Sequence, residues 1–308
     1  MPLVSIVIVS WNVKQLLADC LASIYETSAG LPVEIIVVDS NSSDDTVAML
    51  QRDFPHVKLL ALDENAGFSR GNNLGIPLAT GEYVFLLNPD TLVKPEAIQQ
   101  LAAYLKDHPK AGIVGPQTLN EDATVQSTRR RFPVLLTGLF ESTWLQNIAP
   151  KSILSQYYVQ DKPDDGTFEV DWVQGSALMF RRQVYDQIGG MDEGFMMYSE
   201  ELDWCKRAKL AGWLVVYVGK AQIVHFGGKS SEQAPALTHI RFQCSKLRYY
   251  RKYHGRAKAE ILRFALLANY AAQYLIEGAK RVLGHKPALR AERMQVYATV
   301  LRSGLKVS

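Results

Sequence analysis

VSIVIVSWN, residues 4–12, is a run of apolar and β-branched residues that closes on Ser, Trp and Asn. Such a run is too short and too continuous for a surface helix, so it predicts a strand buried on both faces of a parallel sheet. EIIVVDS (34–40), residues 57–61 and YVFLLN (83–88) predict three more strands. Helical stripes are expected between and after them, at residues 13–28, 46–54, 69–79 and 95–105. The alternation predicts an α/β fold, a mostly parallel Rossmann-like sheet with helices on both faces.

The remaining two thirds of the chain are less regular at first and helical at the end. Further strands are expected at 177–180 and 213–218, with a helix at 200–211 between them. After Pro235 the pattern is helical. We therefore expect a domain over residues 1–235, divided into halves 1–107 and 108–235, and a helical extension over residues 236–308.

Charge is distributed unevenly along the chain. The net charge is +3, but residues 241–308 contain 15 Lys and Arg against 3 Asp and Glu, a net charge of +12, and residues 1–240 carry −9. The basic end favours an anionic partner, and no nucleic-acid-binding motif accompanies it, so we expect no nucleic acid. Three widely spaced cysteines offer no disulfide framework and suit a reducing compartment. With no basic segment before the apolar run at the N-terminus, a cytoplasmic protein is expected.

Polar residues follow four of the expected structural segments. In open parallel sheets ligands bind just beyond the carboxyl ends of the strands. The carboxylate of Asp39 can accept hydrogen bonds from a base or a ribose, and oxygen ligands at positions 88 and 90 can hold a hard cation. Each motif alone has a structural alternative, a helix cap or a turn. The candidate binding residues are Ser10, Trp11, Asn12, Asp39, Asn41, Asn65, Gly67, Arg70, Asn72, Asn88 and Asp90.

Three segments of the second half add candidates. DWVQGSALMFRR (171–182) contains Trp172, which can stack on the apolar face of a sugar or belong to the core. GGMDEGFMMYSEELDWCKRAKLAGW (189–213) places adjacent acids at the start of a helix, and the i, i+4 spacing of Asp203 and Arg207 predicts an ion pair. QIVHFGGKSS (222–231) places His225 directly after a strand.

Four segments together resemble inverting glycosyltransferases of family 2, which have a GT-A fold: SWN (10–12), VVDSNSSDDT (37–46), ENAGFSRGNNLG (64–75) and FLLNPDT (85–91). Residues 189–213 resemble that family's Phe-x-x-Tyr-x-Glu-Asp-x-Asp-Leu signature. The resemblance implies that Asp39 contacts uracil or thymine. It implies that Asp90 binds Mg²⁺ or Mn²⁺ and the diphosphate, with Asn88 at the first position of the family's Asp-x-Asp motif. It also implies that His225 contacts the metal or the diphosphate. Glu201 corresponds to the catalytic base, and Glu200 is the alternative.

The resemblance extends to the sugar-binding segments. Residues 171–182, with Gly175, are similar to the segment that lies beside the donor sugar, and Asp203 is either an acceptor-side or a structural residue. The LNPD variant resembles the branch of bacterial rhamnosyltransferases and galactofuranosyltransferases, as does TRRRFP (128–133), which implies a contact with donor diphosphate or acceptor phosphate.

The implied function is transfer of rhamnose from dTDP-rhamnose to a saccharide or lipid-linked saccharide in polysaccharide synthesis. The alternatives are a UDP-sugar transferase for galactofuranose, GlcNAc or another hexose, and a non-catalytic sugar-nucleotide or glycan-binding module. A sugar-nucleotide-forming nucleotidyltransferase is disfavoured, because residues 10–14 lack its glycine-rich basic loop.

The basic end interleaves Lys and Arg with tyrosines in KLRYYRKYHGRAK (246–258). The apolar stretch within residues 261–286 is shorter than the roughly 20 residues of a membrane span. Basic residues beside an amphipathic helix predict peripheral binding to an anionic membrane, here the inner face of the plasma membrane. The alternative is a helical lid or the interface of a homo-oligomer.

Overall fold

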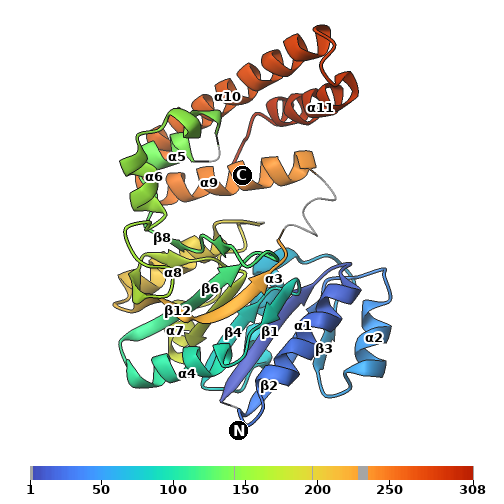
Figure 1. Cartoon of the computed structure of the whole chain (residues 1–308), viewed down its shortest axis with the longest axis vertical. Helices are drawn as coiled ribbons and strands as arrows, with labels where there is room; N and C mark the ends of the chain where they lie inside the picture. Colours follow the sequence, from blue (N-terminus) through green and yellow to red (C-terminus); the bar gives the residue numbers. More distant parts are fainter. Residues whose placement is uncertain (1–2, 142, 196, 228–234, 308) are drawn as a thin grey trace. The chain divides into compact units, whose positions relative to one another are not determined.

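The computed structural model describes residues 3–307, except 142, 196 and 228–234. The chain forms two compact units, drawn in Figure 1. The first comprises Met1–Phe132, Tyr158–Gly194 and Glu200–Ser230. The second comprises Pro133–Tyr157, Phe195–Ser199 and Ser231–Ser308, so it adds two short segments to the helical extension expected from the sequence.

A mixed, mostly parallel sheet forms the first unit, as predicted. Its main strands lie in the order β3-β2-β1-β4-β11-β6-β12-β5. The pairs from β3 to β4 are parallel, as is β6 with β12, whereas β11 and β5 run antiparallel to their neighbours. These strands are β1 (Val4–Ser10), β2 (Val33–Asp39), β3 (Lys58–Ala61), β4 (Tyr83–Leu87), β5 (Thr91–Val93), β6 (Ala111–Leu119), β11 (Ala177–Arg181) and β12 (Leu214–His225).

Short strands extend this arrangement. β7 (Val125–Gln126) pairs with β6, and β9 (Thr167–Val170) pairs with β12. β8 (Arg129–Arg130) and β10 (Trp172–Val173) form a separate antiparallel pair.

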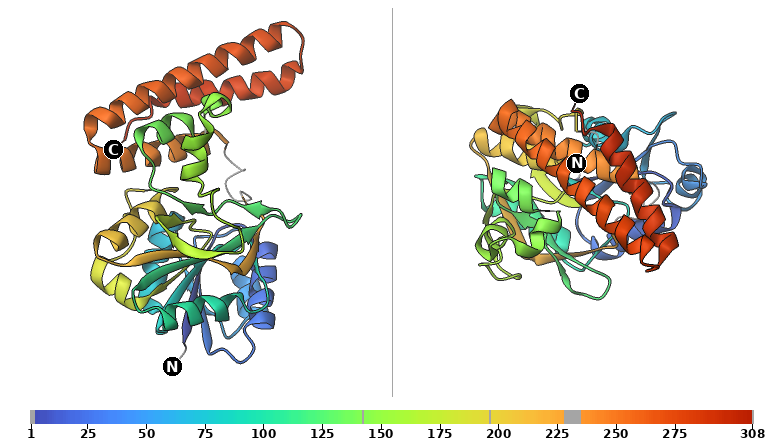
Figure 2. Two further views of the ribbon diagram at one scale, coloured as in Figure 1. Left: turned by 60° about the vertical axis from the view of Figure 1, so that its left-hand side comes forward. Right: turned by 90° about the horizontal axis from the view of Figure 1, so that it is seen from above.

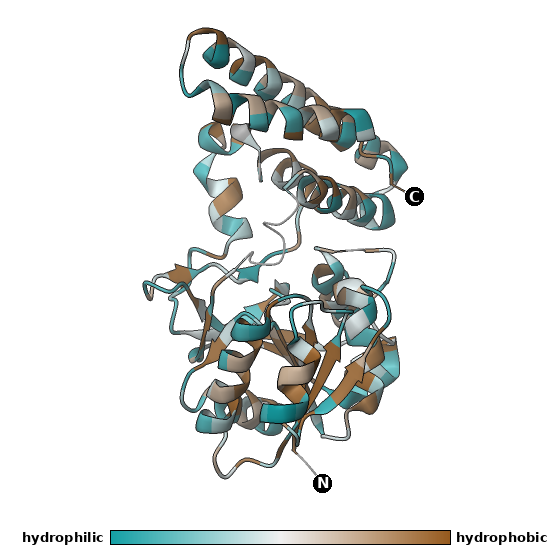
Figure 3. Cartoon of the chain, turned by 90° about the vertical axis from the view of Figure 1, so that its right-hand side faces the viewer, coloured by the Kyte–Doolittle hydropathy of each residue, from teal (hydrophilic) through white to brown (hydrophobic). Residues whose placement is uncertain are grey.

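Helices cover both faces of the sheet because side chains alternate along each strand. In β1, Ile6 and Ile8 pack with α1, α2 and α4, whereas Val7 belongs to the cluster of the opposite face with α7 and α8. The buried strands are the brown elements at the centre of the first unit in Figure 3. These helices, with α3 and η1, are α1 (Lys14–Thr27), α2 (Thr46–Asp53), α3 (Gly67–Gly75), η1 (Ile76–Leu78), α4 (Ala97–Asp107), α7 (Arg182–Ile188) and α8 (Glu200–Leu210).

Strand β6 lies in a region that the sequence analysis left irregular, although all nine of its residues are buried. Its sequence, AGIVGPQTL, contains two glycines and a proline, which are depleted in strand interiors. Both glycines are required by packing. A Cβ at Gly112 would lie 2.7 Å from the Trp213 side chain, and one at Gly115 would lie 2.6 Å from Val173.

The second unit is helical. It contains α5 (Leu135–Phe140), η2 (Trp144–Ile148), α6 (Lys151–Tyr157), α9 (Pro235–His254), α10 (Arg256–Val282) and α11 (Pro287–Ser303). Both views of Figure 2 show α10 and α11 side by side. The Tyr250 hydroxyl donates to the Val134 carbonyl at 2.6 Å, and Lys246 pairs with Glu141 at 2.6 Å, so α9 anchors the segment around α5. Within the described residues, no helix has the length and apolar character needed to cross a membrane.

Candidate functional site

The loops after β1 and β2 are joined at the carboxyl edge of the sheet. Ser10 and Asp39 are register partners at the ends of these parallel strands. The Asn12 amide donates to the Ser42 hydroxyl at 2.9 Å, and Asn12 Oδ1 accepts from the Ser43 amide at 2.7 Å. Asn12 thus holds the second loop against the first, in a left-handed conformation (φ +52°) that asparagine tolerates.

Asp39 presents unused hydrogen-bonding capacity in a buried position. Its side chain is 1% exposed, and Oδ2 accepts from the Ser42 amide at 2.9 Å. In the described part of the chain, Asp39 Oδ1 and the hydroxyls of Ser10 and Ser40 have no hydrogen-bond partner. Each such buried group costs about 1–3 kcal/mol if it stays unpaired. Three of them at adjacent strand ends therefore favour a site that a polar ligand completes.

The other predicted residues of this region lie in the same loops, and several have structural roles. Trp11 is half-buried directly after β1, and Asn41 follows β2 with φ +62°. Asn65 Oδ1 accepts from the Gly67 amide at 2.9 Å, which starts α3. Arg70 pairs with Glu64 at 2.5 Å, and Asn72 Nδ2 donates to the Phe68 carbonyl at 3.0 Å.

The two later glycines of this segment pack the helix on the sheet. A Cβ at Gly71 would meet Val9 of β1 at 2.7 Å, and one at Gly75 would meet Val7 at 2.6 Å. Because these two glycines have no side chain, the backbone of α3 can pack closely against β1.

A candidate cation site lies where β4 and β12 end and β5 begins. Asp90 Oδ1 is 3.4 Å from His225 Nε2, and both side chains are nearly buried. Asn88, two residues before Asp90, has a partly exposed side chain, while its amide donates to the Ser176 carbonyl at 2.9 Å. The structure thus brings the predicted pair of Asp90 and His225 together.

Gln126, which the sequence analysis did not single out, determines how His225 faces this site. Gln126 Nε2 donates to the His225 carbonyl at 2.6 Å, so its Oε1 lies 3.1 Å from Nδ1 of the same ring. Because Oε1 can only accept, Nδ1 carries the proton, and in the neutral ring Nε2 presents a lone pair to the Asp90 carboxylate. A lone pair facing a carboxylate is the arrangement that a cation between them would satisfy, and a neutral Nε2 is a common metal ligand.

This donor set fits a divalent ion that takes its other ligands from elsewhere. Over the described residues there is no group of three or more His, Cys, Asp and Glu side chains that could hold a metal. Asp90 and His225 would supply two ligands, and a bound diphosphate could supply further oxygens.

Replacing Gln126 with leucine is expected to weaken Mn²⁺ binding about 10- to 100-fold, because it removes the hydrogen-bond partner that orients the His225 ring toward Asp90. The affinity would be measured by electron paramagnetic resonance titration with a nucleoside diphosphate present, without any turnover. Gln99→Leu is the matched control, since it also removes an amide bonded to a carbonyl, that of Thr27 at 2.7 Å. Equal Mn²⁺ affinity in Gln126→Leu and wild type would contradict the orienting role.

The predicted acidic pair begins α8. Glu200 and Glu201 are 4% and 9% exposed. Glu201 Oε1 accepts from the Gly175 amide at 3.4 Å, and the Oε2 atoms of both residues have no partner within the described structure. A Cβ at Gly175 would lie 3.4 Å from Glu201 Cβ, an ordinary van der Waals distance, so the Gly175 backbone lies directly beside this side chain.

The two carboxyls differ in their tendency to ionise. Burial raises the pKa of Glu200 well above its ordinary value, and the neighbouring Glu201 charge raises it further. Burial also raises the pKa of Glu201, but amide donors, including that of Gly175, and the positive charge of Arg130 counteract it. Glu201 is therefore the member of the pair that ionises first, leaving Glu200 protonated.

The strand-end residues and the acidic pair are connected by one segment. The Ser176 carbonyl accepts from the Asn88 amide, and the adjacent Gly175 amide donates to Glu201. The loop before β11 thus links the residues around Asp90 to the carboxylate of Glu201, within the first unit.

Asp203 and Trp172 have partners in the first unit. Asp203 is fully buried, and its predicted ion pair with Arg207 is present at 2.9 Å. Trp172 is half-buried, and its Nε1 donates to the Arg131 carbonyl at 3.0 Å. The guanidinium of Arg130 lies over the Trp172 ring, 5.8 Å from its centre.

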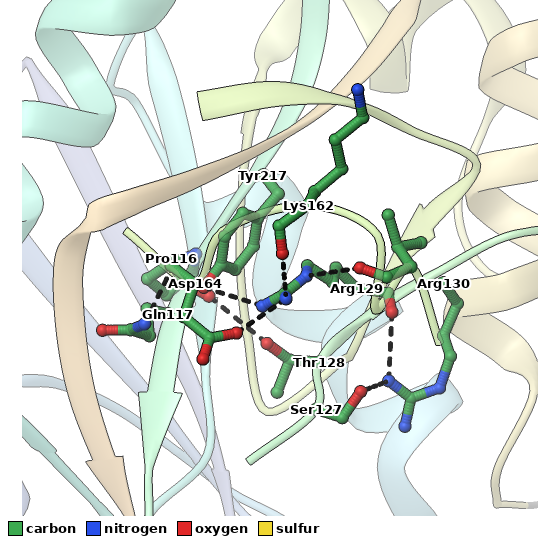
Figure 4. A network of polar contacts seen from close by, with 10 residues as sticks. Pro116, Gln117, Ser127, Thr128, Arg129, Arg130, Lys162, Asp164 and Tyr217 are labelled. Carbon is green, nitrogen blue, oxygen red and sulfur yellow. Dashed lines mark hydrogen bonds and ion pairs between the residues drawn. The ribbon is translucent and has the colours of Figure 1, made fainter. Parts of the chain in front are cut away.

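Arg129 of the TRRRFP segment is buried and has partners within the protein. Figure 4 shows Arg129 inside a polar network, where it pairs with Asp164 at 2.6 Å and donates to the Lys162 carbonyl at 3.1 Å. Its guanidinium also lies 5.0 Å from the centre of the Tyr217 ring. Since Arg129 is 5% exposed and occupied by these partners, its role is structural, and the phosphate contact expected for this segment does not extend to it.

The sequence is similar to those of known glycosyltransferases. Residues 5–189 match the sequence profile described as Glycosyl transferase family 2. The N-acetylglucosaminyl-diphospho-decaprenol L-rhamnosyltransferase of Mycobacterium tuberculosis is 30% identical over 216 residues, 67% of this chain and 70% of that protein. The dTDP-rhamnosyl transferase RfbF of Shigella flexneri is 24% identical over 220 residues, 70% of this chain and 67% of that protein.

A solved structure has the same fold. The mannosyltransferase PcManGT from Pyrobaculum calidifontis, in complex with GDP-Man and Mn²⁺, superposes with a TM-score of 0.58 at 17% identity. The match covers 97% of this chain and 85% of the other.

Proposed function

This chain belongs to glycosyltransferase family 2, and from that premise we propose that it transfers rhamnose from dTDP-rhamnose to a saccharide or lipid-linked saccharide. The names of two relatives support the sugar, and one of them names the dTDP-linked donor. The product would belong to a cell-surface polysaccharide. A UDP-sugar donor is the alternative.

The buried, unpartnered oxygens at the ends of β1 and β2 carry the donor-site proposal. We assign Asp39 Oδ1 and the hydroxyls of Ser10 and Ser40, which are buried without partners in the described structure, to the base and ribose of the nucleotide. Asp90 and His225 are the residues that would hold Mg²⁺ or Mn²⁺, and the bound ion would offset the charge of the departing diphosphate.

Glu201 is proposed to act as the general base through its free Oε2 atom. The acceptor hydroxyl gives its proton to Oε2 while its oxygen forms a bond to the anomeric carbon. The bond from that carbon to the diphosphate oxygen breaks, and the nucleoside diphosphate leaves with the electron pair. A single displacement of this kind inverts the anomeric configuration. The presence of both Asp90 and Glu201 argues against a non-catalytic binding module.

A thermal-shift panel tests the donor site. Thymidine and uridine diphosphates and their sugars, with Mn²⁺, are expected to stabilise the protein, by about 2.7 kcal/mol at a hundred times Kd. The Asp39→Ala variant should lose most of this stabilisation, because it lacks the buried carboxylate. Asp45→Ala is the control, since the Asp45 side chain is 84% exposed in the same loop. A stronger response to purine nucleotides, or an unchanged response in Asp39→Ala, would contradict the proposed site.

A further inference from the structure

Helix α10 carries an apolar stripe on its exposed side. The apolar residues of this stripe are three, four or seven positions apart, which places them on one side of the helix. The three large ones are well exposed, with Ile261 at 56%, Phe264 at 62% and Leu275 at 70%. We call this surface the α10 stripe and define it as Ala257, Ile261, Phe264, Ala268, Leu275 and Ala279.

The stripe is not the side on which α10 packs within its own unit. Leu262, Leu266 and Tyr270 are buried, and they point away from the stripe by helical spacing. On the packed side α10 contacts α9 and α11. The helix is therefore apolar on two sides, and exposed apolar surface of this extent usually marks an interaction site.

Basic residues border both ends of the stripe. Arg256 and Lys258 are exposed at the N-terminal end, and Lys280 and Arg281 are exposed at the C-terminal end. They belong to a region, residues 241–308, whose net charge is +12. A second copy of the chain seated on the stripe would bring two such charges together, whereas an anionic surface would be attracted.

A basic cavity lies beside the stripe in the same unit. Its volume is about 320 Å³, and its lining includes Arg251, Arg256, Arg263 and Lys306, with Glu260. Glu260 is 2.9 Å from the Arg263 guanidinium, which also donates to the Gly304 carbonyl. The described lining thus has four positively charged side chains and one carboxylate, so its net charge is positive. Guanidinium groups bind phosphate oxygens well, because they can donate two parallel hydrogen bonds.

We propose that α10 lies flat on an anionic phospholipid surface. The α10 stripe is immersed at the level of the upper acyl chains, and the basic residues at its ends and in the cavity contact lipid phosphates. The aliphatic parts of long Lys and Arg side chains can lie in the apolar layer while their charged ends reach the headgroups. Because lipid binding needs neither donor nor acceptor, its outcome is separate from that of the proposed transfer reaction.

Vesicle flotation of the full chain tests this proposal. The protein is expected to float with phosphatidylcholine vesicles that contain phosphatidylglycerol and to bind phosphatidylcholine alone much more weakly. The double variant Phe264→Glu, Leu275→Glu should lower the partition coefficient at least about tenfold, because two immersed side chains become charged. Leu210→Glu is the matched control, a leucine that is 74% exposed on α8 of the other unit.

A second variant covers the electrostatic part. Arg256→Glu with Lys258→Glu should reduce binding to the anionic vesicles about fivefold for each positive charge lost, and added salt should remove this difference. Unchanged flotation of the stripe variant overturns the proposal. So does light scattering that shows a lipid-free dimer which the stripe variant converts to a monomer, because the stripe would then be covered by a second copy.

Discussion

The Glu201→Gln variant is expected to lose about 10²- to 10⁴-fold in kcat, the contribution typical of a positioned general base. Glutamine has nearly the same size as glutamate and can still accept a hydrogen bond from the Gly175 amide, so the fold and the donor site should stay intact. The measurement is transfer to a soluble saccharide acceptor, with donor affinity determined in parallel by the thermal shift. Unchanged turnover in Glu201→Gln would overturn the assignment of the base.

Glu200→Gln is the matched control, because it changes the adjacent carboxyl in the same helical turn. Burial and the charge of Glu201 keep Glu200 protonated, and a neutral glutamine resembles that protonated form. Its kcat should therefore remain close to that of wild type. If Glu200→Gln abolishes transfer and Glu201→Gln does not, the two residues exchange roles.

The pH dependence gives this assignment a second readout. Glu201 is active when ionised, and burial raises its pKa above the ordinary 4.5, so kcat of the wild type should fall as pH drops through that raised value. This fall in kcat at low pH should be absent from the residual activity of Glu201→Gln. The effect of pH on the free energy of unfolding is opposite in sign to its effect on kcat. Both carboxyls bind a proton more tightly in the folded state, so the free energy of unfolding decreases as pH rises from 4.5 through their raised pKa values.

The fold was predictable where the sequence is locally consistent. Buried strands such as β1 and β4 are unbroken apolar runs, and the helices between them have clear stripes, so their positions follow from periodicity alone. β6 was not predictable, because Gly112, Gly115 and Pro116 disfavour a strand locally. The two glycines are explained by neighbours distant in sequence, Trp213 and Val173, which leave no room for larger residues.

The residues of the candidate site also include some that the sequence predicts and some that it does not. Asp39 and Asp90 are recognisable because they follow strands, and strand ends gather at one edge of a parallel sheet. Gln126 has no such signal. It lies in a two-residue strand, and its significance comes from two contacts with His225, 99 residues away. Arg129 is the opposite case, since its arginine-rich surroundings suggest a surface role and only the packing shows that it is buried.

Arg207→Met is expected to lower the free energy of unfolding by about 3–5 kcal/mol, because it leaves the fully buried Asp203 carboxylate without its cation. Arg207 also donates to the carbonyls of Ile188 at 2.7 Å and Gly190 at 2.6 Å, so its loss would release the segment before α8 as well. Chemical denaturation of the full chain measures the change. Arg52→Met is the control, since Arg52 pairs with Asp53 at 2.7 Å but is 72% exposed, and solvent screens such a pair, so its loss should change stability little.

The same variants separate the two roles open to Asp203. If the pair is structural, Arg207→Met and the double variant with Asp203→Asn should be less stable but should keep the wild-type KM for the acceptor at a temperature where they are folded. The double variant should be more stable than the sum of the two single changes implies, because removing both partners leaves no buried charge unpaired. A stable Arg207→Met protein with a raised acceptor KM would instead place Asp203 at the acceptor. The carboxylate has no exposed surface and already binds the Arg207 guanidinium, and this favours the structural outcome.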